Sequence, residues 1–175
     1  MRPLLAACAI GIAIAGAGSA GAAEARITDD TASQSSLLKA VRQATARYHS
    51  PTEAARAGFV RSSPCEVSPA GGMGYHYVNF DNLMAPGFDL RNPEVLLYAP
   101  RPNGTVELVG VEYLVPDSGQ KLSTTLDRPS LGEVPFDGPM PGHTAQMPVH
   151  YDLHVWLYRS NPDGMYASWN PDVTC

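Results

Sequence analysis

The stretch from residue 95 to residue 115 constrains the fold most, because it predicts two apolar β-strands joined by a tight turn. The runs 95–98 and 105–115 are rich in β-branched and aromatic residues. Between them, Asn103-Gly104 is the strongest two-residue signal for a hairpin. In the second run, one face carries residues 109, 111, 113 and 115, and the other carries 106, 108, 110, 112 and 114. Both faces are mostly apolar, so we expect a central strand covered on both sides.

Two helices are expected before the strands. The first begins at a serine cap at position 35 or 36 and runs to about residue 48, with apolar residues at helical spacing. The second begins after Ser50, which is a good N-cap. Pro51 suits the first helical position, and Glu53 completes a Ser-x-x-Glu capping box. Gly58 is expected to end this short helix.

The rest of the chain predicts further strands and one long loop. Strands are expected over 73–80, 149–158 and 165–169, the last two joined by the turn Asn161-Pro162-Asp163-Gly164. Residues 116–148 are rich in proline and glycine, and a loop of this length is typical of a lid or a binding segment. The fold class is therefore α+β, with N-terminal helices packed on a mostly antiparallel sheet.

The first 23 residues predict a signal peptide. Arg2 is the only charged residue before Glu24, an apolar segment follows it, and Ala20-Gly21-Ala22 fits the small-x-small rule for cleavage. Residues 24–34 are polar and are expected to be flexible. Residues 35–175 then form a single domain. No later segment has the apolar length of a membrane span, so we expect an exported protein in the bacterial periplasm or outside the cell.

Composition excludes two classes of protein. The 175 residues are 44% apolar and 17% charged, a balance too apolar for a disordered chain. The net charge of −5 argues against a nucleic-acid partner, since binding to phosphates needs a basic face.

The three cysteines predict one disulfide. Cys8 lies in the signal peptide, and the sequence around it resembles a lipoprotein box. Only seven residues precede it, however, so lipid anchoring is not expected. Cys65 and Cys175 remain, and in an oxidising compartment they are expected to pair.

Glu112 is a candidate functional residue because it interrupts an apolar strand. A buried carboxylate must be protonated, paired with a cation or bound to a metal ion. The plain structural alternative is a glutamate paired with an arginine or hydrogen-bonded to a tyrosine.

Histidines concentrate in or beside the expected strands. His76 lies in the strand 73–80, His150 and His154 lie in the strand 149–158 with Asp152 between them, and His143 precedes that strand. On a strand, His150 and His154 are about 13 Å apart, too far to share one ion. Neighbours two residues apart, or residues from adjacent strands, are close enough. A set of histidines with a carboxylate is typical of a metal site, although the same pattern also suits the wet face of a half-exposed strand.

A second metal hypothesis concerns the end of the long loop. Met140, His143, Met147 and His150 alternate thioether and imidazole side chains, a combination that suits copper. The structural alternative is that Met147 fills a gap in the core.

Four blocks of the sequence resemble a group of exported bacterial proteins of unknown function. They are Tyr48-His49-Ser50, Gly72–Asn79 (GMGYHYVN), Leu108–Tyr113 and Pro148–Tyr158 (PVHYDLHVWLY). The resemblance implies a bacterial, exported origin and carries no activity, cofactor or ligand with it.

These observations lead to three hypotheses. In the first, a pocket beside the sheet, covered by the 116–148 loop, binds a divalent metal (Zn, Fe or Cu) or a small polar ligand. Its residues would be drawn from His76, Glu112, His143, His150, Asp152 and His154. The second hypothesis is the copper-binding module, and the third is an interaction domain whose surface includes Tyr158, Tyr166 and Trp169. The sequence leaves open whether the protein is an enzyme, since no known catalytic motif is present.

Overall fold

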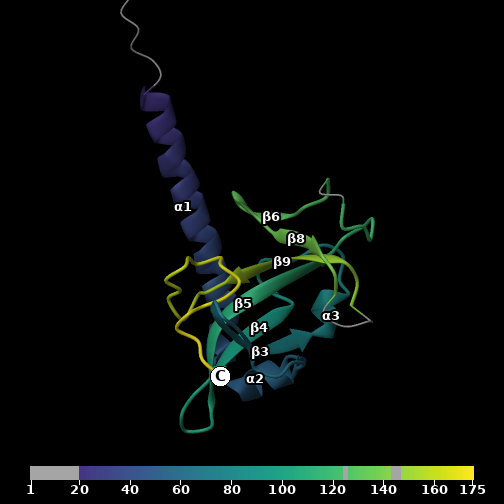
Figure 1. Cartoon of the computed structure of the whole chain (residues 1–175). Coiled ribbons are helices and arrows are strands. Elements are labelled where there is room, and N and C mark those ends of the chain that lie inside the picture. Colours follow the sequence, from purple (N-terminus) through teal and green to yellow (C-terminus); the bar gives the residue numbers. More distant parts are fainter. Residues whose placement is uncertain (1–19, 124–125, 143–146) are drawn as a thin grey trace, which may run out of the picture.

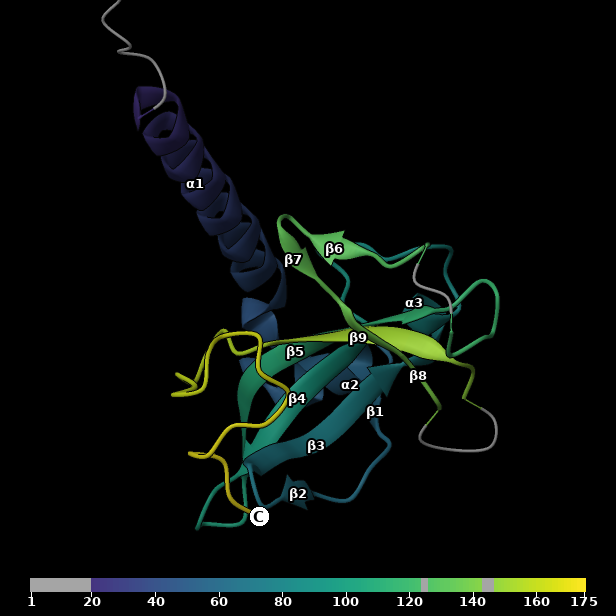
Figure 2. The same cartoon turned by 45° about the horizontal axis from the view of Figure 1, so that its top comes forward.

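The computed structural model describes residues 20–123, 126–142 and 147–175, with side chains from residue 32 onward. A seven-stranded antiparallel sheet forms its centre, in the order β1-β3-β4-β5-β9-β8, with β2 paired to the other end of β3 (Figure 2). Its strands are β1 (Phe59–Arg61), β2 (Glu66–Ser68), β3 (Gly71–Asn79), β4 (Val95–Pro100), β5 (Val106–Pro116), β8 (Asp137–Met140) and β9 (His150–Val155). The expected hairpin is confirmed as β4 and β5, which lie in the middle of the sheet.

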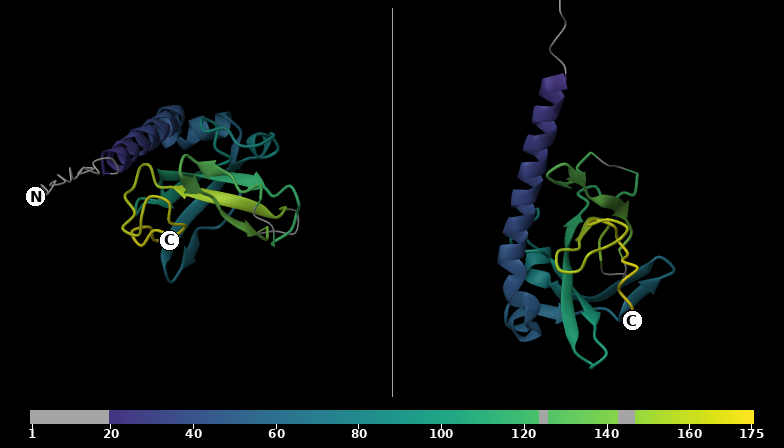
Figure 3. Two further views of the ribbon diagram at one scale, coloured as in Figure 1. Left: turned by 90° about the horizontal axis from the view of Figure 1, so that it is seen from above. Right: turned by 90° about the vertical axis from the view of Figure 1, so that its left-hand side faces the viewer.

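The N-terminal helices cover one face of this sheet and the C-terminal residues lie against the other (Figures 1 and 3). The helices are α1 (Ala20–Thr45), the short 3-10 helix η1 (Ala46–His49), α2 (Pro51–Arg56) and α3 (Phe80–Leu83). The N-terminal half of α1 projects beyond the sheet. The predicted α+β fold is thus confirmed. None of the helices in the described part of the chain has the length and apolar character needed to cross a membrane.

The first helix begins earlier than the sequence indicated. It starts at Ala20 and continues through Ser36, so the expected cap at position 35 or 36 is wrong, and residues 24–34 are helical. Alanine has the highest helix propensity, and the alanines of residues 20–25 extend the helix backward. The Ser36 hydroxyl donates to the carbonyl of Ser33 within the helix.

The cap of α2 is confirmed. Ser50 adopts an extended conformation, and its Oγ accepts a hydrogen bond from the Glu53 amide at 3.4 Å. The reciprocal half of the capping box is absent, because the Ser50 amide donates to the Arg47 carbonyl instead. Gly58 follows the helix with φ +92°, a backbone conformation that favours glycine.

Replacing Ser50 by alanine is expected to lower the free energy of unfolding by about 0.5–1 kcal/mol, because the Glu53 amide loses its side-chain acceptor and keeps only the Ser50 carbonyl, at 3.0 Å. Ser50→Asp keeps an acceptor and is expected to stay within about 0.5 kcal/mol of the wild type. Urea unfolding measures both values. Equal losses in the two variants would contradict a capping role.

Two buried clusters cover the two faces of the sheet. On the helix face, residues from the helical segment and β1 (Val41, Tyr48, Ala54 and Phe59) pack on Leu96, Tyr98, Leu108, Val111, Tyr113, Tyr151, Leu153 and Val155. On the opposite face, which we call the tail face, the buried cluster consists of Val95, Leu97, Ala99, Val109, Leu114, Trp156 and Val173. The expectation that β5 is covered on both sides is confirmed.

The assignment of residues to the two faces of β5 needs one correction. The pairing with β4 shifts between Leu97, opposite Gly110, and Tyr98, opposite Leu108, which leaves Val109 as an extra residue. Leu108 therefore packs on the helix face and Val109 on the tail face, the reverse of simple alternation. Alternation predicts the faces correctly from residue 111 onward.

The long loop and the last strand also differ from expectation. Residues 116–148 contain β6 (Ser130–Leu131), β7 (Val134–Pro135) and the edge strand β8. The sequence suggested that this segment covers a pocket beside the sheet. Leu131 and Phe136 are instead buried in the helix-face cluster, so most of the segment does not cover the tail face. Residues 165–169 form no strand. They are irregular, and Trp156 donates its backbone amide to Met165 and its indole N–H to Ala167.

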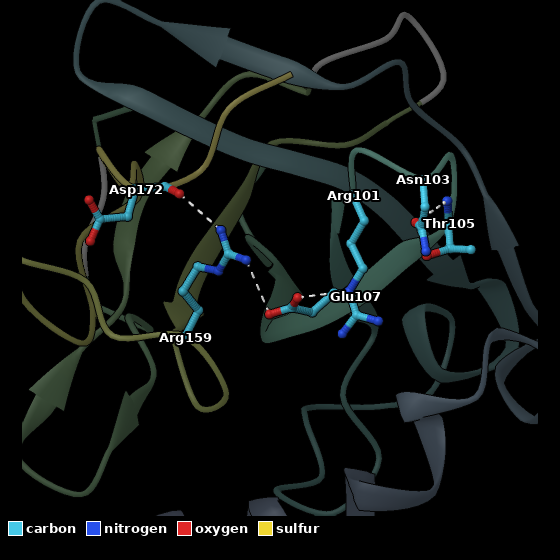
Figure 4. Close-up of polar contacts among 6 residues, drawn as sticks. All are labelled: Arg101, Asn103, Thr105, Glu107, Arg159 and Asp172. Atoms are coloured by element: carbon cyan, nitrogen blue, oxygen red, sulfur yellow. Dashed lines mark hydrogen bonds and ion pairs between the residues drawn. The ribbon is translucent and has the colours of Figure 1, made fainter.

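Several contacts hold the C-terminal residues against the sheet. The predicted disulfide is present between Cys65 and Cys175, whose Cα atoms are 5.8 Å apart. Gly72 and Asn170 exchange two backbone hydrogen bonds. Glu107 on β5 binds both Arg101 and Arg159, and Arg159 also donates to the carbonyl of Asp172 at 2.9 Å (Figure 4). The tail is thus anchored at several points, of which one is covalent.

Candidate metal centre

Three side chains from three strands converge on the tail face of the sheet. His76 comes from β3, Glu112 from β5 and His154 from β9. Each offers one ligand atom, and these atoms all lie within 4.8 Å of one another. His76 Nε2 and Glu112 Oε2 are 3.5 Å apart, and the rings of His76 and His154 lie nearly perpendicular, with centroids 6.4 Å apart. This group could hold a metal ion.

The strand pairing explains how residues so distant in sequence meet. Glu112 lies directly opposite His154 in the β5–β9 ladder, so the two Cβ atoms are about 5 Å apart. His76 lies opposite Leu97 on β4, which separates β3 from β5. The imidazole of His76 therefore reaches across β4 to Glu112, rather than coming from an adjacent strand as the sequence suggested.

Glycine allows β3 to approach β4 closely next to this group. Gly74 has φ +83°, and a Cβ added there would lie 2.4 Å from the carbonyl oxygen of Tyr98. A side chain at this position would push the strands apart two residues from His76. The glycine of the Gly-Tyr-His sequence is therefore part of what positions the imidazole.

Glu112 is buried, as the sequence predicted, with 4% of its surface exposed. Burial raises its pKa well above the usual value, and the charges of Asp152 and Glu94 raise the pKa further. Its Oε2 atom has no hydrogen-bond partner within the described ranges, and its ion-pair partner there is His76 rather than an arginine. A cation at this place would neutralise the carboxylate.

Two further buried carboxylates lie near Glu112. Burial raises the pKa of Glu94 to about 7, although the backbone N–H of Leu114, which donates to Glu94 Oε2 at 3.1 Å, lowers it. Burial and the charge of Asp137 raise the pKa of Asp152 to about 7. Asp152 Oδ1 also has no hydrogen-bond partner in the part of the chain that the structure describes. Acidic groups thus gather around the site, and their raised pKa values favour the protonated forms when no cation is bound.

The remaining candidates from the sequence do not belong to the group of three converging ligand atoms. His150 and Asp152 share the tail face of β9 with His154, since residues two apart on a strand point the same way, and both are buried. The His150 ring contacts the carbonyl of Pro148 through Nδ1, at 3.0 Å. His143 lies outside the described residues.

The methionines of the copper hypothesis are only partly placed by the structure. Met140 on β8 is half-buried and lies opposite His150 in the ladder. Met147 packs against the tail-face cluster, as its structural alternative predicted. With His143 outside the described residues, copper binding by this segment stays a prediction.

The site is a buried cluster rather than an open pocket. His154 is 1% exposed, and the His76 side chain, at 15%, is the most exposed of the three. An open hollow of about 510 Å³ lies elsewhere, beside the disulfide, lined by residues 67–71, 171 and 173–175 together with Asp163. The tight spacing and burial suit a single ion better than an organic ligand.

The aromatic residues of the third hypothesis are integrated into the fold. Tyr158 and Tyr166 pack against the helix-face cluster, and the Tyr158 hydroxyl lies 2.9 Å from that of Thr45 on α1. Trp169 is half-buried and its carbonyl accepts from Asn161 at 2.9 Å. Tyr158 and Tyr166 are therefore packing residues, and an interaction surface at these positions stays a prediction.

Sequence reasoning missed two residues near the site, Ser63 and Glu94. Ser63 Oγ lies 3.1 Å from both the backbone nitrogen and Nδ1 of His76. It precedes a proline in a polar segment, so no pattern distinguished it from an ordinary turn residue. Glu94 comes just before β4, where a glutamate normally marks a solvated strand end.

Comparisons with known proteins identify no relative, because no family model, no curated protein and no solved structure matches the chain.

Proposed function

We propose that this protein is an exported metal-binding protein that holds one divalent transition-metal ion through His76, Glu112 and His154. The observation that carries the proposal is the convergence of two imidazoles and a buried carboxylate, with ligand atoms within 4.8 Å. Two histidines and a carboxylate are a common ligand set for Zn²⁺ and Fe²⁺, and imidazole also suits Cu²⁺. The disulfide and the signal-peptide pattern support export.

The spacing of the ligand atoms fits an ion after a small adjustment. In a tetrahedral Zn²⁺ site, ligand atoms about 2.1 Å from the ion are about 3.4 Å from each other. His76 Nε2 and Glu112 Oε2 already have this separation, at 3.5 Å. Contacts up to 4.8 Å would shorten by up to about 1.4 Å when the side chains turn toward the ion.

Charge supports the same conclusion. Glu112, Glu94 and Asp152 are all at most 5% exposed. None of the ion pairs in the described residues joins these carboxylates to an arginine or a lysine. Such buried carboxylates are costly, and a divalent cation is the charge that would offset them best. Three protein ligands also leave a coordination position open for water or for a further ligand.

Metal analysis of the untagged protein tests the proposal. Wild type is expected to contain about one equivalent of a transition metal, or to bind one equivalent of Zn²⁺ after chelation, whereas the His76→Ala, His154→Ala double variant binds none. His49→Ala is the control, because His49 is exposed at the end of η1 and contacts the Tyr158 ring edge to face, away from the site. Equal metal content in wild type and the double variant would overturn the proposal.

A further inference from the structure

We propose that Ser63 positions His76 for metal binding and that the Cys65–Cys175 disulfide holds Ser63 in place, so that tight metal binding follows disulfide formation. In this proposal, which rests on the proposed metal site, the oxidation state of the two cysteines regulates the affinity of that site for metal.

The hydrogen bonds of Ser63 determine which nitrogen of His76 faces the metal site. A serine hydroxyl has one proton to donate and two lone pairs to accept with. Ser63 donates its proton to the carbonyl of Pro64 at 2.7 Å and accepts from the backbone N–H of His76 at 3.1 Å. The 3.1 Å contact with Nδ1 therefore requires Nδ1 to carry the proton and donate it to Ser63.

This arrangement leaves Nε2 of a neutral His76 with its lone pair directed at Glu112. A lone pair and a carboxylate oxygen 3.5 Å apart do not attract each other without a proton or a cation between them. Fixing the tautomer through a hydrogen bond on the other ring nitrogen is how proteins usually orient a metal-ligating histidine.

The disulfide fixes the segment that carries Ser63. β1 and β2 both pair with β3, with Arg61 opposite Tyr77 and Glu66 opposite Gly74, so residues 62–65 bridge the two short strands beside His76. β2 has three residues and an irregular register, which makes its pairing weak. The Ser62 amide donates to the His76 carbonyl at 2.9 Å on one side of Ser63, and the covalent bond at Cys65 adds a constraint on the other side.

Reduction would release this constraint without removing the other anchors of the tail. A dithiol reductant transfers two electrons and two protons, which gives two cysteine thiols and the oxidised dithiol. The backbone hydrogen bonds between Gly72 and Asn170 remain, as does the contact of Arg159 with the Asp172 carbonyl. The reduced chain is therefore expected to stay folded but to hold Ser63 loosely. For an exported protein, metal uptake would then wait until the chain reaches an oxidising compartment.

A double-mutant cycle with Zn²⁺ as the probe tests this coupling. Ser63→Ala is expected to raise the Kd ten- to a hundredfold, the usual effect of removing an outer-shell partner. The Cys65→Ser, Cys175→Ser variant, which has no thiols to bind zinc, is expected to lose affinity to a similar degree. Adding Ser63→Ala to the cysteine variant should raise the Kd little further, because the serine and the disulfide act through the same contact with His76. Ser63→Thr keeps the hydroxyl and should restore affinity.

Nitrogen NMR of the His76 ring gives a readout that a merely structural role would not move. Wild type is expected to show the Nδ1–H tautomer, and Ser63→Ala to lose that preference. If wild type shows this tautomer but binds no Zn²⁺, the proposed function fails while the positioning role stands. Affinities within twofold across the variants, or fully additive losses, would overturn the regulation. A cysteine variant that does not fold would also overturn the regulation, which needs a folded chain without the disulfide, and the Ser63 variants would then test the positioning of His76 alone.

Discussion

Replacing Glu112 by glutamine is expected to weaken metal binding and to make the metal-free protein more stable. The variant loses a charged ligand, so the Kd for Zn²⁺ should rise at least about 100-fold, beyond the usual cost of an outer-shell change. At pH 8, wild type must hold Glu112 either as a buried anion or as a protonated acid. Glutamine has nearly the same shape and no charge, so the free energy of unfolding should rise by about 1–3 kcal/mol.

Glu107→Gln is the matched control, because Glu107 lies on the same strand and is half-exposed. Arg101 and Arg159 both contact it, and they lower the pKa of its carboxyl (Figure 4). Removing this charge should lower stability slightly, by up to about 1 kcal/mol, and leave Zn²⁺ binding unchanged. Urea unfolding of chelated protein and Zn²⁺ titration measure the two effects. A Glu112→Gln variant that is less stable than wild type and binds Zn²⁺ equally well would contradict the proposal that Glu112 is a metal ligand.

The sign of the change in the free energy of unfolding separates a carboxylate kept for a ligand from one kept for stability. A carboxylate kept for stability would cost stability when it is removed. A carboxylate kept for a ligand weakens the unliganded fold and is compensated only when the cation binds. Glu112 is buried beside Asp152 and Glu94, and its ion-pair partner in the described residues is a histidine that the proposed metal would also bind, so we expect the second case.

Sequence alone predicted the elements of this fold better than their boundaries. The hairpin at Asn103-Gly104 and the cap at Ser50 are local signals, and both appear in the structure. The start of α1 was wrong because a polar stretch with many alanines can continue a helix as well as fray. The face of Leu108 was wrong because a single extra residue in a strand reverses alternation, and no sequence pattern announces it.

The candidate site was predictable in its residues but not in its assembly. Glu112 was distinguished by an apolar strand around it, and the histidines by their strand positions. Which of them meet depends on strand order, because β3, β5 and β9 are separated by long connections in sequence. Ser63 acts through a contact between segments 13 residues apart, and a serine in a turn has no property that marks such a role.

The metal-free protein is expected to become less stable as the pH rises from 5 to 8, and Glu94 should account for about 3 kcal/mol of that loss. Its pKa is about 7 in the folded protein and near 4.5 when unfolded. Between these values the folded state retains a proton that the unfolded state releases, so rising pH favours unfolding. A difference of about 2.5 units corresponds to about 3 kcal/mol, lost progressively between pH 4.5 and 7. The raised pKa of Asp152 acts in the same direction.

Glu94→Gln isolates this contribution, because its carbonyl oxygen can still accept the N–H of Leu114. The variant and wild type should have similar stability at pH 5, and the variant should be more stable at pH 8 by up to about 3 kcal/mol. Glu107→Gln should not change the difference between pH 5 and pH 8, because its lowered pKa keeps Glu107 ionised throughout that range. Chelator-treated samples unfolded with urea at several pH values give the comparison. Parallel pH profiles for wild type and Glu94→Gln would show that Glu94 is solvated in the folded protein, and would remove one of the three charges that we expect a bound metal to offset.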